Sequence, residues 1–239
     1  MIETLDNDPT VQGTLPNTLA DVYTLSEIEA IAQKATRGAG WYWGLTEEAG
    51  KAARWLGGYG LPGAELLAQL LENDAPEPGR PAQPSLVGKV WRVRHGLLCP
   101  IVAGVLMSDR GETIAAGKPQ YTGPTALPLL SSISMAPLAL GLGISVRVSW
   151  DRTSLLFTPD SLVIDGSDDD LMVDRTESVR FAAERSTAQQ AARTRHFEFG
   201  SRRIDPGPWQ VLERLAYRTY APATEQSRAG AGSSTTDQD

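Results

Sequence analysis

The chain has 239 residues, of which 41% are apolar, 29 are acidic and 22 are basic. This length corresponds to one ordinary domain or to one domain with appendages, and the apolar share suffices for a folded core. The net charge of -7 gives no electrostatic footprint for nucleic acid or for an anionic membrane. A single cysteine excludes a disulfide within the chain, and with only two histidines it excludes a zinc site built from cysteine and histidine.

The N-terminal region contains three predicted helices. Ser26 and Glu29 have the spacing of a capping box, so the first helix is predicted to begin near Ser26 and to end at Gly38 or Gly40. Two more helices are predicted from apolar residues at helical spacing, over residues 46–56 and 64–73. Small residues recur on one face of the second helix, which predicts close packing against another helix.

Strand patterns dominate the middle of the chain, after a proline-rich stretch. Apolar and polar residues alternate from Ile144 to Trp150, which is the period of a strand with one buried face. Further strands are predicted over residues 155–157, 162–164, 179–181 and 197–199, and also over 90–93 and 101–107. Short turns between successive strands predict antiparallel pairing, because parallel pairs need long crossovers.

One uncharged segment raises the question of a membrane span. No charged residue occurs between Lys118 and Arg147, a length that would suffice to cross a bilayer. Prolines and glycines interrupt this segment, and a lipid-exposed helix would leave the broken backbone without hydrogen bonds. We therefore interpret it as a buried, irregular segment with one short helix near residues 137–142.

A last helix is predicted over residues 208–220, because apolar residues recur there at helical spacing after a proline suited to a first turn. The chain then divides into five predicted segments: a flexible arm (1–21), a helical N-terminal part (22–73), a proline-rich linker (74–85), a β-rich body with a closing helix (86–220) and a flexible tail (221–239). Together they predict an α+β fold with N-terminal helices, an antiparallel β-sheet body and a C-terminal helix.

Two glycine-arginine segments form the candidate anion site, Arg37-Gly-Ala-Gly40 and Arg228-Ala-Gly-Ala-Gly232. Glycines allow consecutive backbone N–H groups to converge on a phosphate or carboxylate, and arginine adds a bidentate donor. We predict anion binding by Arg37, Gly38, Gly40 and Arg228. The alternative is that the first segment ends a helix and that the second belongs to an unrelated tail.

Aromatic residues follow the first of these segments directly, from Trp41 to Trp43. We predict that Trp41 and Trp43 line the pocket by stacking on a planar or cationic group, and that Arg54 on the second helix reaches the same loop. The alternatives are that the rings fill the core and that Arg54 pairs in solvent with Glu47 or Glu48.

Two other patterns suggest chemistry but have plainer explanations. His95 and Cys99 would be juxtaposed on a helix as an imidazole and a thiolate, but a glycine and a proline beside them disfavour a helix there. The run from Asp165 to Asp170 departs from a calcium loop at its sixth and twelfth positions, and it is interpreted as a solvated turn. No metal site is predicted.

Several stretches of the chain carry a family resemblance: Leu25-Ser-Glu-Ile-Glu29, Lys34-Ala-Thr-Arg-Gly-Ala-Gly40, Trp43-Gly-Leu-Thr-Glu-Glu-Ala-Gly50, Arg54-Trp-Leu56, Arg218-Thr-Tyr-Ala-Pro-Ala-Thr-Glu-Gln-Ser-Arg228 and Thr236-Asp-Gln-Asp239. In these residues the chain resembles a bacterial protein family catalogued only as a domain of unknown function. The resemblance implies no catalytic role, and it implies that the tail with Arg228 belongs to the module.

The leading functional hypothesis is a cytoplasmic protein that binds a small anionic metabolite carrying a carboxylate or a phosphate. If the protein is an enzyme, a metal-free lyase or hydrolase would use a carboxylate such as Glu47 or Glu48. The rival hypothesis is an accessory subunit that docks onto a partner protein through Trp55, Leu67 and Leu71. Neither nucleic acid nor a membrane is predicted as a partner, and the sequence specifies no cofactor.

Overall fold

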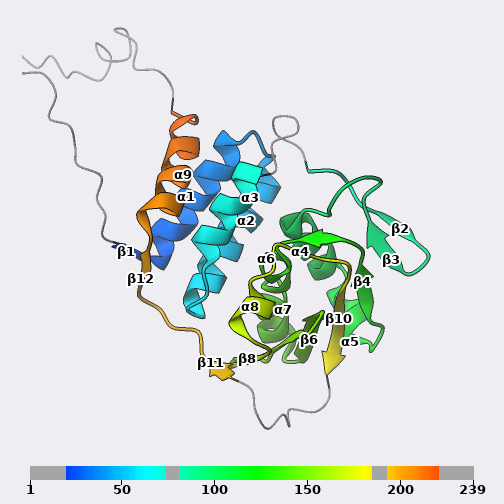
Figure 1. The fold of residues 1–239 in the computed structure, drawn as a ribbon. Helices are drawn as coiled ribbons and strands as arrows, with labels where there is room; N and C mark the ends of the chain where they lie inside the picture. Colours follow the sequence, from blue (N-terminus) through cyan, green and yellow to red (C-terminus); the bar gives the residue numbers. More distant parts are fainter. Residues whose placement is uncertain (1–19, 74–80, 185–192, 221–239) are drawn as a thin grey trace, which may run out of the picture.

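The computed structural model describes residues 20–73, 81–184 and 193–220. The predicted α+β class is confirmed, with helices near both ends of this part of the chain and a mostly antiparallel sheet between them (Figure 1). The predicted flexible tail, including Arg228, lies outside the described residues, as do residues 1–19 of the predicted arm and residues 74–80 of the predicted linker.

Four helices of the described chain pack together: α1 (Leu25–Gly38), α2 (Trp43–Gly58), α3 (Gly63–Asn73) and α9 (Pro206–Tyr217). α2 packs against α1 and α3, and α9 also packs against α1 and α3. Figure 1 shows α9 beside α1, although the two helices lie at opposite ends of the described sequence. The predicted closing helix therefore packs on the N-terminal helices, while the division of the chain into domains stays a prediction.

α1 begins at a capping box that differs from the predicted one. The Glu27 amide donates to the Thr24 hydroxyl at 3.2 Å, and the Thr24 amide donates to the Glu27 carboxylate at 2.7 Å. The assignment of the box to Ser26 and Glu29 was wrong, because the same spacing occurs twice within this short stretch. Glu29 instead forms an ion pair with Arg54 of α2.

Glu65 in the first turn of α3 provides a pH-dependent prediction. Burial raises the pKa of its carboxyl group, which makes the protonated form the one that folding favours. Its contribution to stability is therefore present below the unfolded pKa of about 4.3 and is lost as the pH rises through the higher folded pKa. We expect Glu65→Gln to melt at a slightly higher temperature than the unsubstituted protein at neutral pH, with the difference shrinking in acid. Thermal denaturation as a function of pH measures this, and a lower melting temperature at neutral pH would contradict it.

The main sheet has eight strands among the described residues, in the order β11-β8-β7-β6-β10-β4-β3-β2. Their bounds are β2 (Ser85–Val87), β3 (Val90–Arg92), β4 (Gln120–Thr122), β6 (Ser145–Trp150), β7 (Thr153–Phe157), β8 (Leu162–Asp165), β10 (Val179–Glu184) and β11 (Arg193–Arg195). All neighbouring strands pair antiparallel except β3 and β4, which are parallel. The predicted antiparallel body is thus confirmed for most of the sheet.

The predicted alternation in β6 is confirmed. Val146, Val148 and Trp150 are buried, whereas the polar residues between them are partly exposed. Val148 lies opposite Leu155 of β7 and Phe181 of β10, so the apolar residues of three strands share one face. This face forms the part of the core that packs against α7 (Met135–Leu142).

Two predicted strands were wrong. Residues 101–107 lie in a helix, α4 (Pro100–Asp109), in which Pro100 occupies the first turn. Residues 197–199 lie in the irregular connection between β11 and β12 (Ser201–Ile204). β12 pairs antiparallel with β1 (Asp21–Thr24), and this small sheet leads directly into α9.

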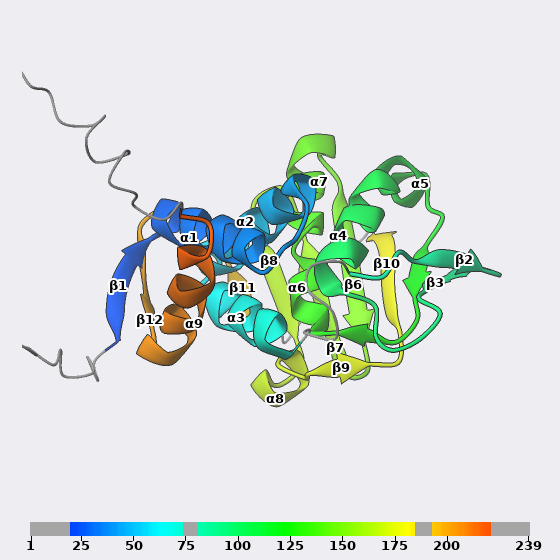
Figure 2. The same ribbon diagram turned by 90° about the horizontal axis from the view of Figure 1, so that it is seen from above.

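Short apolar helices lie between the main sheet and the N-terminal helices: α4, α6 (Pro128–Ser132) and α7 (Met135–Leu142). α7 contacts β6 and β7, and α4 contacts α2. Figure 2 shows α2 and α3 between α1 and the body. The remaining elements are α5 (Gly111–Ala115), α8 (Asp168–Leu171) and the paired strands β5 (Thr125–Ala126) and β9 (Arg175–Thr176). Within the ranges that the structure describes, no helix combines the length and the apolar character needed to cross a bilayer.

Candidate functional site

In the predicted anion loop, the Arg37 side chain forms a hydrogen bond with the backbone of the loop itself. Arg37 is exposed at the end of α1, and its Nη1 atom donates to the Trp41 carbonyl oxygen at 2.8 Å. Its guanidinium lies 5.2 Å from the centre of a ring of Trp43, which is a cation–π distance. In this conformation Arg37 and Trp43 stabilise the turn between α1 and α2.

The two glycines of this loop have structural roles of their own. A Cβ atom at Gly38 would overlap the carbonyl oxygen of Leu215 in α9, so α1 and α9 approach closely there. Gly40 has a φ of 91°, in the left-handed region that favours glycine, and its amide donates to the Arg37 carbonyl at 2.8 Å. These contacts account for an arginine and two glycines at these positions without a ligand. Anion binding by Arg37, Gly38 and Gly40 stays a prediction.

The structure separates Arg54 from this loop. Trp41 is buried in the core, whereas Trp43 has 66% of its surface exposed. Arg54 lies eleven residues after Trp43 on the same helix, which corresponds to about 16 Å along the helix axis. Arg54 therefore belongs to a different surface from Arg37.

Arg54 borders a cavity of about 420 Å³ where α2 faces α4 and α7, which we call the α2–α4 cleft. The walls of the cleft combine apolar side chains with two serines: Ala52, Trp55, Ile101, Val105, Leu130, Ile133, Pro137, Ser108 and Ser134. A volume of this size is typical of a pocket for a small organic ligand.

Two ion pairs lie on the rim of the α2–α4 cleft. Arg54 Nη1 is 2.8 Å from Glu29 Oε2, and Lys51 Nζ is 2.7 Å from Glu48 Oε1. The hydrogen bond to Glu48 raises the pKa of Lys51, which keeps its ammonium charged at neutral pH. The rim therefore carries two cations, Arg54, which is partly exposed, and Lys51, which is exposed.

A second cavity of about 430 Å³ shares Arg54 and Trp55 with the α2–α4 cleft, and we call it the aromatic chamber. Trp55, Tyr59, Phe197 and Phe199 line it, together with Leu140 of α7. The ring of Phe197 makes edge contacts with those of Trp55 at 4.7 Å and Tyr59 at 5.6 Å between centroids. Sequence patterns missed this chamber because Phe197 and Trp55 lie far apart along the chain.

Residues 193–204, which we call the return segment, hold Phe197 in place. Arg195 donates to the carbonyl oxygens of Tyr59 and Gly60 at 3.1 and 2.9 Å, and Arg202 donates to those of Gly57 and Gly58. These carbonyls belong to the last residues of α2 and to the turn that follows it, at the negative end of the helix dipole, so cations are favourable beside them. The return segment is thus docked on the C-terminal end of α2, which is the end nearest the aromatic chamber.

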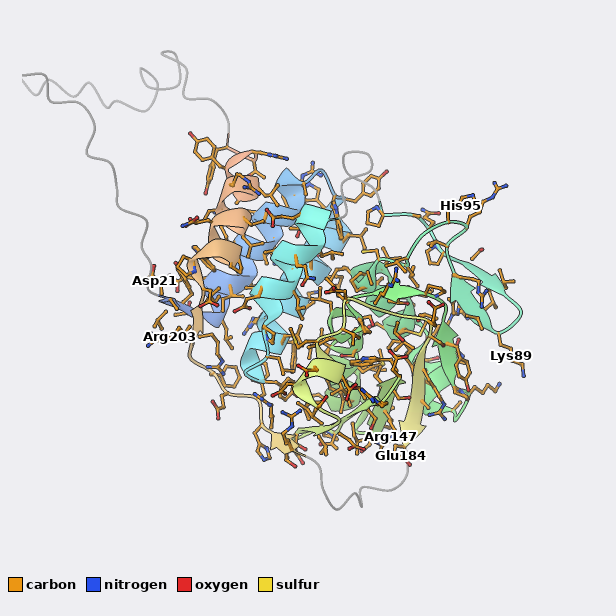
Figure 3. All side chains as sticks on the ribbon, viewed as in Figure 1. Asp21, Lys89, His95, Arg147, Glu184 and Arg203 are labelled. Atoms are coloured by element: carbon orange, nitrogen blue, oxygen red, sulfur yellow. The ribbon has the colours of Figure 1, made fainter. Side chains whose placement is uncertain are left out.

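The other candidates of the sequence are not brought together. Figure 3 places His95 at the outer edge of the molecule, near β2 and β3, whereas Cys99 is buried at the start of α4.

The acidic run from Asp165 to Asp170 pairs with neighbouring side chains. Hydrogen bonds from Arg193 and Ser167 lower the pKa values of Asp168 and Asp170, respectively. Groups of three or more metal-ligating side chains are absent from the part of the chain that the structure describes.

Residues 23–96 match the family model of a protein of unknown function, DUF3726. The predicted resemblance to a domain of unknown function is confirmed over this range, which includes α1 to α3 and therefore Arg54 and Lys51. Its bacterial origin stays a prediction. No curated protein matches the sequence significantly.

A malate dehydrogenase from Entamoeba histolytica is among the solved structures that resemble this fold. The likeness has a TM-score of 0.43 and 12% sequence identity, and it covers 66% of this chain and 49% of that one. The chain thus spans about half the length of this dehydrogenase.

Proposed function

We propose that this chain is a cytoplasmic protein that binds a small anionic metabolite in the α2–α4 cleft. Arg54 is the principal ligand for the anion and Lys51 the second. The observation that carries the proposal is the position of Arg54, which borders both the α2–α4 cleft and the aromatic chamber. The single cysteine of the chain is in keeping with a reducing compartment.

The hydrogen bonding of Arg54 supports this role. Only its Nη1 atom donates to Glu29, and no other described residue accepts a hydrogen bond from the guanidinium. The remaining N–H groups form a planar fork that matches the geometry of a carboxylate or a phosphate. An anion can thus bind Arg54 without breaking the ion pair that positions it.

The proposal extends to binding and leaves the reaction open. Of the two carboxylates that the sequence suggested for lyase or hydrolase chemistry, Glu48 borders the α2–α4 cleft and Glu47 is exposed. Glu48 already accepts a hydrogen bond from Lys51. Catalysis by either residue stays a prediction.

A matched pair of arginine variants tests the proposal against the loop predicted from the sequence. We expect carboxylate- or phosphate-bearing metabolites to raise the melting temperature of the unsubstituted protein by about 5–10 °C at a hundredfold excess over Kd. Arg54→Gln is expected to abolish most of this shift, because it removes the principal cation of the cleft, whereas Arg37→Gln is expected to retain it.

Differential scanning fluorimetry across a library of organic acids, amino acids and phosphate esters measures these shifts. Circular dichroism of both variants checks that the fold is retained. Loss of the shift in Arg37→Gln alone would move the site back to the loop between α1 and α2. No shift with any member of the library would overturn anion binding.

The rival hypothesis of an accessory subunit predicted docking through Trp55, Leu67 and Leu71, and these residues do not form one exposed face. Leu67 and Leu71 are buried in the core of this chain, and Trp55 lines the two cavities. Leu67 and Leu71 are therefore not presented to a partner protein, whereas Trp55 is partly exposed. An accessory role stays a prediction.

A further inference from the structure

The charges on the rim of the α2–α4 cleft sum to zero, since Arg54 and Lys51 are balanced by Glu29 and Glu48. Lys51 and Arg54 lie three residues apart on α2, a spacing that places two side chains next to each other on one face of a helix. The two ion pairs are therefore neighbours. A ligand that enters the cleft meets carboxylates as well as cations.

This balance disfavours a ligand that carries only negative charge. An anion bound to Arg54 would lie beside the Glu29 carboxylate, because Arg54 Nη1 and Glu29 Oε2 are 2.8 Å apart. Like charges at such short range repel each other, and the cost rises when they are partly withdrawn from water. A positive group on the same ligand, placed next to its anion, would remove this repulsion.

Glu29 is able to accept such a group. Its Oε2 atom accepts from Arg54, and no described residue donates to its Oε1 atom. The open oxygen of Glu29 and the open N–H groups of Arg54 belong to one ion pair, so they lie side by side. This arrangement matches an ammonium and a carboxylate attached to the same carbon atom of one ligand.

The aromatic chamber indicates what else the ligand carries. Arg54 and Trp55 form the boundary between the two cavities, and the chamber beyond them is lined by the rings of Tyr59, Phe197 and Phe199. Phe199 is 82% exposed, so the chamber keeps ring surface that the protein itself does not bury. Ring edges and faces of this kind favour an aromatic or large apolar group.

We propose, building on the function proposed above, that the ligand is a zwitterion of the amino-acid class with an aromatic side chain. Its carboxylate binds Arg54, its ammonium binds Glu29, and its ring enters the aromatic chamber beside Trp55. This assignment names the substrate class of the cleft and leaves the reaction open.

The test compares ligands that each lack one of the three groups. Isothermal titration of the full chain uses L-phenylalanine, 3-phenylpropanoate (no ammonium), 2-phenylethylamine (no carboxylate) and L-alanine (no ring). We expect L-phenylalanine to bind at least about tenfold more tightly than each of the other three, since each lost contact is charge-assisted or aromatic.

A substitution at Glu29 separates recognition of the ammonium from a structural effect. Glu29→Gln is expected to weaken L-phenylalanine by about tenfold and to strengthen 3-phenylpropanoate, because it removes both the ammonium partner and the repulsion. A merely structural role of Glu29 would change both affinities in the same direction. Glu47→Gln is the matched control, since Glu47 is an exposed carboxylate that borders neither cavity.

The outcomes distinguish this inference from the proposed function. Equal or tighter binding of 3-phenylpropanoate, lost in Arg54→Gln, would overturn the zwitterion and leave anion binding at Arg54 in place. Stabilisation by aliphatic carboxylates alone, again dependent on Arg54, would have the same meaning. If neither these probes nor the library of organic acids and phosphates bind, both proposals fail.

Discussion

Gly38→Ala is expected to destabilise the protein by about 2–4 kcal/mol and to lower its melting temperature by about 5–12 °C. The added Cβ would overlap the Leu215 carbonyl oxygen, which is backbone and cannot rotate away. α1 and α9 must then separate, and the contact between the two ends of the described chain is weakened. Alanine is the better helix former, so its higher propensity offsets only about 1 kcal/mol of this cost.

Gly44 supplies the matched control for this substitution. It lies in the first turn of α2, and a Cβ atom there would meet no other atom within 4 Å. Gly44→Ala is therefore expected to leave the melting temperature unchanged or to raise it slightly. Thermal and urea denaturation without added ligand compare the two variants, and equal stabilities would contradict the close approach of α1 and α9. A loss in Gly38→Ala alone would assign Gly38 to helix packing.

The elements that the sequence predicted well are those whose signal is local. In β6 the alternation of Val146, Val148 and Trp150 with polar residues reflects a strand with one buried face, and burial follows this pattern. The apolar run of α4 has no such alternation and is buried on several sides, so periodicity alone does not separate helix from strand there. Pro100 was the remaining signal, as a residue suited to the first turn of a helix.

The candidate site was predictable only in part because its members come from separate elements. Arg54 was predicted to reach the loop after α1, whereas the structure pairs it with Glu29, which had been assigned to a helix cap because two capping patterns overlap in the sequence. Phe197 reaches the aromatic chamber from an irregular segment more than a hundred residues away from α2. Such proximity depends on tertiary packing, which residue spacing does not encode.

The return segment explains why α2 ends in a glycine at position 58. A Cβ atom at Gly58 would overlap the ring of Phe197, and the Gly58 carbonyl accepts from the Glu198 amide at 2.9 Å. The ring of Phe197 therefore lies flat against a position without a side chain. This contact couples the end of α2 to the wall of the aromatic chamber.

Gly58→Ala is accordingly expected to cost about 2–3 kcal/mol and to displace Phe197 from the chamber. Urea denaturation measures the cost, and hydrogen exchange at the Glu198 amide reports whether the return segment has moved, since that amide would lose its acceptor. The new methyl group at position 58 would overlap the ring of Phe197 and not the backbone.

A double-mutant cycle with Phe197→Ala separates this clash from any other effect of alanine at Gly58. Phe197→Ala removes the ring and costs stability of its own, but it also leaves room for the new methyl group. The double variant should therefore be more stable than the sum of the two single costs by about 1–2 kcal/mol. Purely additive costs would mean that Phe197 does not rest on Gly58, and the aromatic chamber would then lose the wall on which its ligand preference depends.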